Sequence, residues 1–306
     1  MNFQFSGHET FPLRQLWLQK AFEHTHRHLT ESNKRTSFFS GEDAMIELGV
    51  GKNMVVSLRF WANAVGIIRQ GNNGKWIPTE LGMLLLAKDG GLDPYSENPS
   101  TPWIVHWNLV SSPDRLSVFW YLFNHVNKPS VTRSELQAGL VELAGRHNFR
   151  ISDSSIKRDV EVCLRSYLPM LSDRNKKLSE EFVEPLLGDL DIIRTSSRDV
   201  IELQRNARPT LHNALFAYAL LDFWNKQSNR AATLDFNSIA YDIGSPGRVF
   251  KIDENSLVRR LETLGELTEG NMVWSEQAGI RTVIRTGDAL NNPVDYMFHL
   301  IQLAYQ

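Results

Sequence analysis

Three residue types near the amino terminus are suited to breaking a phosphodiester bond. The segment "SGHETFPLR" places His8, Glu9 and Arg14 within seven residues. In such a set the imidazole would act as a base, the carboxylate would bind Mg²⁺ or Mn²⁺, and the guanidinium would stabilise developing negative charge. A structural role is the alternative, in which Thr10 caps a following helix and Glu9 favours its positive end. Both interpretations place these residues just before a helix.

That helix and the next two elements are predicted from apolar spacing. Residues 12–29 are expected to form a helix opened by Pro12, and "GEDAMIELG" a second helix that ends at Gly49. A third helix follows the "GVGKN" turn. Its apolar face is formed by Val55, Leu58, Trp61, Ala62 and Val65.

Two short strands are expected after the third helix. Ile67 and Ile68 precede a "QGNNG" turn, and "KWIPT" follows it, which is typical of a hairpin with an Asn-Gly connection. Helix, tight turn, helix and hairpin is the order of a winged helix-turn-helix. The glycines of "GVGKN" would permit the sharp turn between the two helices.

The Gly51-Lys52 pair also resembles part of a phosphate-binding nucleotide loop. Such a loop needs a glycine five residues before the pair and a hydroxyl residue after it, to hold magnesium. Ile46 and Asn53 occupy those two positions. The sequence therefore predicts no nucleotide cofactor.

The polar face of the third helix predicts contact with double-stranded DNA. A helix in the major groove reads base edges with short polar side chains, while a wing meets phosphates with cations. Lys52 lies at the start of this helix. We expect bases to be contacted by Asn53, Ser57, Arg59 and Asn63, and phosphates by Arg69 and Lys75. The alternative is a winged fold used for protein contact, with these residues forming a solvated face.

The middle of the chain is expected to be helical. Residues 100–127 are dense in aromatic side chains, whose spacing suits buried helices better than a platform for stacking single-stranded bases. Two capped helices follow, in "TRSELQAGLVELAGRHN" and "SDSSIKRDVEVCLRSYL", and Ser152 or Asp153 begins the second. Cys163 occupies an apolar helical position there, which favours a buried structural thiol over a nucleophile.

Three carboxylates on this second helix, Asp153, Asp159 and Glu161, are candidates for a magnesium site. Lys157 and Arg158 lie between them. The pattern therefore favours a charged helical surface.

The final third repeats the order helix, turn, helix and hairpin, which predicts a second winged unit near residues 230–288. We expect a mainly α fold with small β-hairpins, in which N-terminal and C-terminal winged helix-turn-helix units surround a helical middle region. The predicted domains are residues 1–99, 100–227 and 228–306.

Composition limits the function classes. The formal net charge of the 306 residues is -2, so contact with nucleic acid must come from local patches. Cys163 is the single cysteine, which excludes an intrachain disulfide and fits a reducing compartment. The sequence shows neither a secretion signal nor an apolar run of about 18 residues that would span a bilayer. We therefore expect a cytoplasmic protein with no membrane partner.

Four segments together resemble a known bacterial family. They are "FSGHETFPLRQLWLQKAF", "LGVGKNMVVSLRFWANAVGII", "LDPYSENPSTPWIVHW" and "SSIKRDVEVCLRSYLP". The family was long labelled as of unknown function, and its members occur beside Ssp-type DNA phosphorothioation genes, as SspB-like DNA-nicking components. The resemblance implies a role in replacing a non-bridging phosphate oxygen of DNA by sulfur. It also implies three partners: a cysteine desulfurase, an ATPase and an ATP-pyrophosphatase-like sulfur transferase.

Two functional hypotheses follow. The first is a metal-assisted DNA nickase within a modification and antiphage defence complex. The second is a DNA-binding or scaffolding subunit without chemistry, because no nuclease motif with paired carboxylates and a following lysine occurs in the sequence. The resemblance carries over no catalytic motif, so His8, Glu9 and Arg14 rest on chemistry alone.

Overall fold

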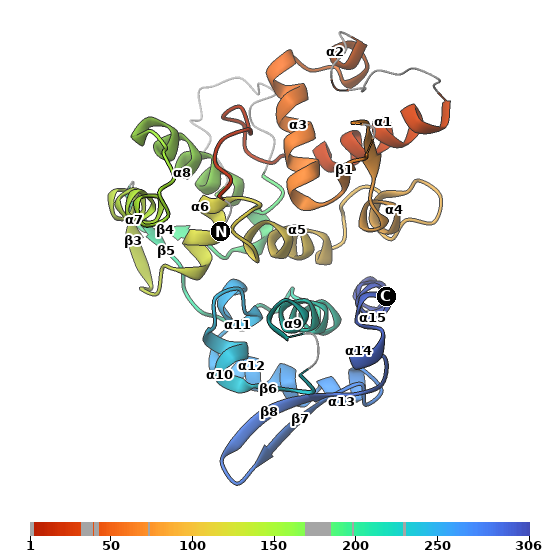
Figure 1. The fold of residues 1–306 in the computed structure, drawn as a ribbon, viewed down its shortest axis with the longest axis vertical. Helices are drawn as coiled ribbons and strands as arrows, with labels where there is room; N and C mark the ends of the chain where they lie inside the picture. Colours follow the sequence, from red (N-terminus) through yellow and green to blue (C-terminus); the bar gives the residue numbers. More distant parts are fainter. Residues whose placement is uncertain are drawn as a thin grey trace.

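The computed structural model describes residues 3–31, 39, 43–72, 74–168, 185–197, 199–228 and 231–306. Across these ranges the chain is mainly helical, as the sequence predicts, and it forms three small antiparallel sheets (Figure 1). The winged helix-turn-helix arrangement and the division into three domains stay predictions.

The N-terminal part combines helices with one two-stranded sheet. Its described elements are α1 (Trp17–Glu31), α2 (Asp43–Leu48), α3 (Lys52–Val65), β1 (Ile68–Gln70), β2 (Trp76–Pro78) and α4 (Glu80–Leu86). The second helix, the third helix and the hairpin are confirmed in the predicted order. Gly41, Glu42 and Asn73, which belong to these predicted segments, lie outside the described residues.

Helix α3 forms because its apolar positions fall on one face. All five residues of the predicted face are buried, and burying a large apolar side chain contributes about 1.5–3 kcal/mol. Gly66 ends the helix at a φ of 83°, a left-handed conformation that glycine adopts without a steric penalty. Its N–H donates to the carbonyls of Ala62 and Asn63, and strand β1 begins two residues later.

The start of α1 differs from the prediction. The helix begins at Trp17 and not at Pro12. Glu9, Thr10 and Leu16 have φ values of 47°, 67° and 63°, whereas a right-handed helix needs φ near about −63°. Residues 9–16 therefore lie outside α1 as turns and irregular chain, and Thr10 does not cap the helix.

The middle part contains a sheet that the sequence did not predict. Its described elements are α5 (Ser100–Val110), α6 (Ser117–Asn124), β3 (Ser130–Thr132), α7 (Arg133–Arg146), α8 (Asp153–Tyr167), η3 (Gly188–Leu190), β4 (Arg194–Thr195) and β5 (Val200–Glu202). Strand β5 pairs with both β3 and β4. Ser152 is the N-cap of α8, because its hydroxyl accepts from the N–H of Ser155. The prediction of a purely helical middle region is therefore corrected.

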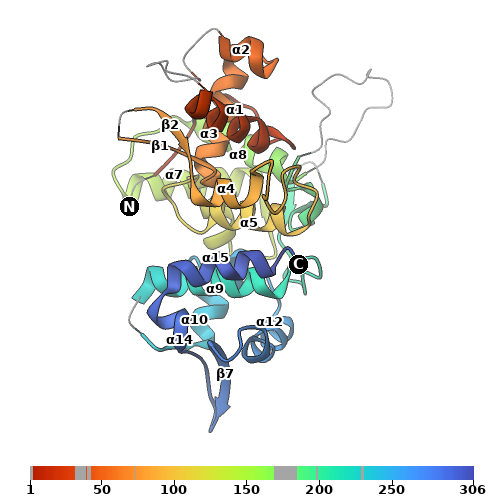
Figure 2. The same cartoon turned by 90° about the vertical axis from the view of Figure 1, so that its right-hand side faces the viewer.

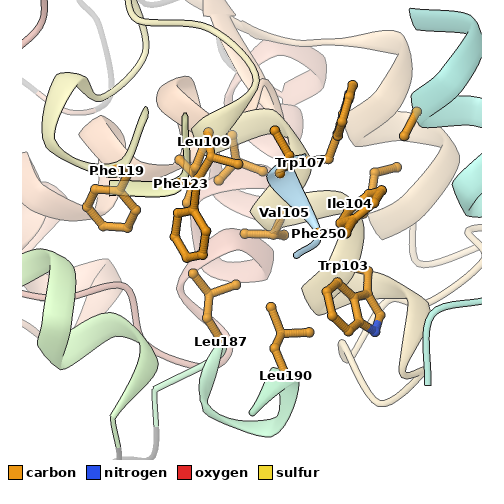
Figure 3. Packing of buried hydrophobic residues seen from close by; sticks show 14 of the residues in the cluster. Trp103, Ile104, Val105, Trp107, Leu109, Phe119, Phe123, Leu187, Leu190 and Phe250 are labelled. Atoms are coloured by element: carbon orange, nitrogen blue, oxygen red, sulfur yellow. The ribbon is translucent and has the colours of Figure 1, made fainter. Parts of the chain in front are cut away.

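The aromatic residues of α5 and α6 form part of the hydrophobic core. Trp103, Trp107, Phe119 and Phe123 are all at most 1% exposed, which confirms core packing over a stacking platform. Figure 3 shows them with Phe250 and with leucines from the neighbourhood of η3. Among the described helices, none combines the length and the apolar character that crossing a bilayer requires.

The C-terminal part packs around α9. Its described elements are α9 (Asn213–Ser228), β6 (Thr233–Asp235), α10 (Phe236–Tyr241), α11 (Pro246–Val249), α12 (Glu254–Glu262), α13 (Leu264–Leu267), β7 (Met272–Gln277), β8 (Ile280–Arg285), α14 (Gly287–Asn291) and α15 (Pro293–Leu303). Helices α9 and α15 lie side by side (Figure 2). The predicted hairpin near 272–285 is confirmed, and its turn is Ala278-Gly279, both with positive φ.

Two parts of the fold share one topology. The order strand, helices, hairpin occurs from β3 to β5 and again from β6 to β8. In each sheet the last strand lies in the centre, giving the orders β3-β5-β4 and β6-β8-β7. The sequence predicted that the C-terminal third repeats the order of the N-terminal part, whereas the shared sheet topology relates the C-terminal part to the middle part.

Candidate nucleic-acid interface

The outer face of α3 carries most of the side chains expected to meet DNA. Lys52, Asn53 and Asn63 are exposed, and Arg59 is partly exposed. Ser57 is different, because it is fully buried and its hydroxyl donates to the carbonyl oxygen of His8 at 2.9 Å. Ser57 therefore lies on the packed side of the helix and holds the N-terminal segment there.

Arg59 connects α3 to the hairpin. Its guanidinium carbon lies 5.5 Å from the centre of the Trp76 ring, and Trp76 is the first residue of β2. Arg69 is exposed on β1, where it pairs with Ile77, and Lys75 is partly buried just before β2. Because packing on an aromatic ring orients a guanidinium, Trp76 positions the Arg59 side chain beside the hairpin.

This segment is positively charged although the whole chain is slightly acidic. Residues 48–79 contain Lys52, Arg59, Arg69 and Lys75 and no Asp or Glu, while the chain as a whole has a formal net charge of -2. The preceding carboxylate, Glu47, already accepts from Arg27 at 2.6 Å. The outer side of α3 with β1 and β2 is called the DNA-facing surface below, because the sequence predicts DNA contact there.

His8 is buried between the DNA-facing surface and the middle part. It is 3% exposed, and its ring stacks on Trp61 of α3. The N–H of Thr10 donates to Nδ1 at 3.2 Å, so Nδ1 is the acceptor and Nε2 carries the proton. Nε2 lies 3.0 Å from Oδ1 of Asp159 and donates to it. Both ring nitrogens are therefore engaged within the protein.

Glu9 and Arg14 have different surroundings from His8. Glu9 is exposed, whereas Arg14 is 8% exposed and lies against the rings of Phe11 and Trp17, at 5.6 and 5.2 Å. The three residues are near in sequence, but the structure gives each a separate environment, and Arg14 forms a β-bridge with Pro185.

Gly7 is required by this packing. Its φ is 95°, and a Cβ at this position would lie 2.7 Å from two ring atoms of Phe60. A side chain there would thus displace the N-terminal segment from α3, and His8 with it. The "SGH" sequence is explained by close packing.

Asp159, a candidate magnesium ligand from the sequence, has a different role that sequence reasoning did not predict. It lies on α8, is 5% exposed, and accepts from the N–H of Ser6 at 2.8 Å as well as from His8. The expected charged helical surface is therefore wrong at this position. One turn further on, Cys163 is confirmed as buried, and burial raises the pKa of its thiol, as does the neighbouring Asp159.

The comparisons with known proteins place the chain in a family. The model of DUF4007, described as a protein of unknown function, matches residues 5–299. The chain belongs to this family. No curated protein matches the sequence.

Solved structures of SspB resemble this DUF4007 protein over nearly its whole length. A magnesium ion-bound SspB crystal structure has a TM-score of 0.84 and 26% sequence identity, covering 99% of this chain and 88% of that one. A second SspB crystal structure has a TM-score of 0.83, with the same identity and coverage. The resemblance to an SspB-like family is thereby confirmed.

The donor atoms around His8 do not fit a divalent metal ion in this DUF4007 protein. The Asp159 carboxylate and both nitrogens of His8 are already hydrogen bonded, which leaves the exposed carboxylate of Glu9. Mg²⁺ prefers an octahedron of oxygen ligands with one or two carboxylates. Within the described ranges, no three His, Cys, Asp or Glu side chains gather in a group that could hold a metal ion.

Proposed function

We propose that this chain is the DNA-binding component of an Ssp-type DNA phosphorothioation system, and that it nicks one DNA strand so that sulfur can be incorporated. The observation that supports DNA binding is the DNA-facing surface, with four cations and no carboxylate between residues 48 and 79. The likeness to SspB supports the link to the modification system.

The polar residues of this surface suit the two kinds of DNA contact. Asn53 and Asn63 are exposed amides, and amides pair with adenine edges in the major groove. Lys52 and Arg69 are exposed cations that suit phosphate oxygens. Together they would position α3 on a duplex.

The proposed partners follow from the same likeness. In an Ssp-type system the chain would act beside a cysteine desulfurase, an ATPase and an ATP-pyrophosphatase-like sulfur transferase. A nick would open the backbone where one non-bridging oxygen is exchanged for sulfur. Dependence of the nick on Mg²⁺ or Mn²⁺ stays a prediction, and no step is assigned to a metal here.

A non-catalytic DNA-binding or scaffolding subunit is the second candidate. It is favoured by the environment of His8, whose two nitrogens already bond Asp159 and Thr10. A base must have a free acceptor within reach of the proton it removes. In this second role, chemistry would be supplied by another protein of the complex.

Supercoiled plasmid distinguishes the two functions. The purified chain is incubated with plasmid and Mg²⁺ or Mn²⁺, and open circles are quantified beside DNA binding. The nickase proposal predicts open circles, and predicts that Glu9→Gln reduces them while Glu23→Gln, an exposed carboxylate on α1, does not. Intact plasmid with DNA still bound would establish the non-catalytic role.

A further inference from the structure

A second cationic site lies away from the DNA-facing surface. It is a pocket of about 270 Å³ where the end of α6, the segment after β5 and α11 meet. Four cations line it: Lys128, Arg205, Arg248 and Lys251. The described residues that line the pocket include no Asp or Glu.

The walls of this pocket are fixed by backbone hydrogen bonds between distant segments. The N–H of Leu203 donates to the carbonyl of Pro129 at 2.8 Å, and the N–H of Asn206 donates to the carbonyl of Lys251 at 2.9 Å. Helix α11 packs against α6 on the same side (Figure 1). The cations are therefore carried by backbone segments that hydrogen bonds hold together.

Two of the cations are held at the carboxyl end of α6. The Lys251 ammonium donates to the carbonyls of Phe123 at 2.9 Å and Val126 at 3.3 Å. Arg248 donates to the carbonyl of Asn124 and, at 3.0 Å, to the side-chain oxygen of Asn127. A helix end carries roughly half a negative charge. That charge is too small to balance Arg205, Arg248 and Lys251.

The remaining negative charge near the pocket is peripheral. Lys128 pairs with Glu135 at 3.4 Å, but both side chains are at least half exposed, so this ion pair is weak. Glu254 and Asp242 act on Arg205 and Arg248 through their fields and do not line the pocket. Arg205 donates to the carbonyls of Gly247 and Ile252, so among the described lining residues no carboxylate offsets the positive charge.

Two N–H donors at the pocket have no described acceptor. Nε of Arg248 is buried without a hydrogen-bond partner among the described residues. An ammonium has three donors, and the hydrogen bonds described for Lys251 use two of them. Lys251 is 5% exposed, so an unused donor there is costly unless a ligand accepts from it.

We propose that this pocket binds a phosphate group, free or carried by a nucleic acid strand. A tetrahedral oxyanion offers several acceptors, matches the planar fork of arginine and balances the surplus positive charge. The proposal does not rest on the proposed function, because the pocket and the DNA-facing surface share no residue.

Burial makes the pocket sensitive to pH. Burial, together with Arg205, Arg248 and Arg208, lowers the pKa of Lys251 to about 7. The other titratable groups around it are Lys128 and His106, and burial lowers the pKa of His106 to about 3. A bound anion favours the charged ammonium. Affinity should therefore fall as pH rises through 7, because neutral Lys251 no longer attracts the ligand.

Calorimetric titration of the full chain with inorganic phosphate tests the proposal. We expect saturable binding at one site, weakened about tenfold or more by Arg205→Gln, which removes a charge-assisted donor. Lys128→Glu should weaken it as well, and its 74% exposed side chain makes loss of folding no concern. Lys157→Glu, the same charge change on an exposed residue of α8, is the matched control.

Sulfate, whose charge is constant near neutrality, provides the pH readout. Its affinity should drop several-fold between pH 6 and pH 8.

Short oligonucleotides then identify the source of the phosphate. If only a 5′-phosphorylated strand displaces the bound anion, the ligand is a strand end. If the 5′-hydroxyl form of that strand also displaces it, the ligand is an internal phosphodiester. If neither strand displaces it, the ligand is free phosphate. Absence of saturable binding to the folded chain, or equal affinity for wild type and both pocket variants, would overturn the proposal.

Discussion

The pairing of His8 with Asp159 joins residues that are 151 positions apart. Asp159 accepts from His8 and from the backbone of Ser6, and the carbonyl of His8 accepts from Ser57 on α3. The N-terminal segment is thereby attached to α3 and α8 at once. A buried carboxylate with two donors is stable only while both remain in place.

Replacing Asp159 should therefore destabilise the fold. Asp159→Ala leaves the buried Nε2–H of His8 and the partly buried N–H of Ser6 without their acceptor, which we expect to lower the free energy of unfolding by about 2–4 kcal/mol. Urea denaturation measures the change. Asp153→Ala, at the exposed start of the same helix, should cost less than about 1 kcal/mol. Equal losses for the two variants would contradict the pairing.

Single-residue environments were only partly predictable from the sequence. Helical periodicity correctly placed Lys52, Asn53 and Asn63 on the exposed side of α3. It failed for Ser57, because a small hydroxyl fits either side and its acceptor, the carbonyl of His8, belongs to a distant turn. It failed for Asp159 for the same reason, since no local pattern reveals a partner 151 residues away.

At the scale of elements, α3 and the hairpin form one unit because Arg59 stacks on Trp76. This contact links the helix to the first residue of β2. The Arg59 side chain also remains partly exposed, as the proposed contact with DNA requires.

Substitutions of Arg59 separate these two contributions. If Arg59 contacts bases, Arg59→Ala should weaken duplex affinity by about 1–3 kcal/mol, measured by fluorescence anisotropy at fixed salt. Arg59→Lys keeps the charge but loses the planar stacking, and we expect an intermediate loss. Wild-type affinity in folded Arg59→Ala would remove this residue from the interface.

The elements that the sequence predicted are those with local signals. Both hairpins have close strands and glycine-containing turns, and both were found. The middle sheet was missed because β3 and β5 are three residues each and lie about 70 positions apart in the chain. Such pairing depends on tertiary packing, which periodicity does not report. The start of α1 was predicted wrongly because Pro12 suits the first turn of a helix. In the structure, Thr10 and Leu16 have positive φ angles, so the helix begins only after Leu16.

At the scale of the whole molecule, positive charge gathers locally on a chain of formal net charge -2. Among the described residues it does so at the DNA-facing surface and at the pocket around Lys251. His106 of α5 connects elements of the middle and C-terminal parts within the core. Its ring forms hydrogen bonds with the hydroxyl of Tyr167 in α8 and with the carbonyl of Val249 in α11. Burial keeps the pKa of His106 near 3, so this junction stays neutral at physiological pH.

The salt dependence of duplex binding tests the central claim, that residues 48–79 form a DNA-binding surface. Each phosphate contact contributes about −0.9 to the slope of log affinity against log salt. In the double variant Lys52→Gln/Arg69→Gln the slope should become shallower by about 2. The control double variant Lys157→Gln/Arg158→Gln, at exposed positions of α8, should leave the slope unchanged. A wild-type slope in the first double variant, with folding intact, would contradict the claim.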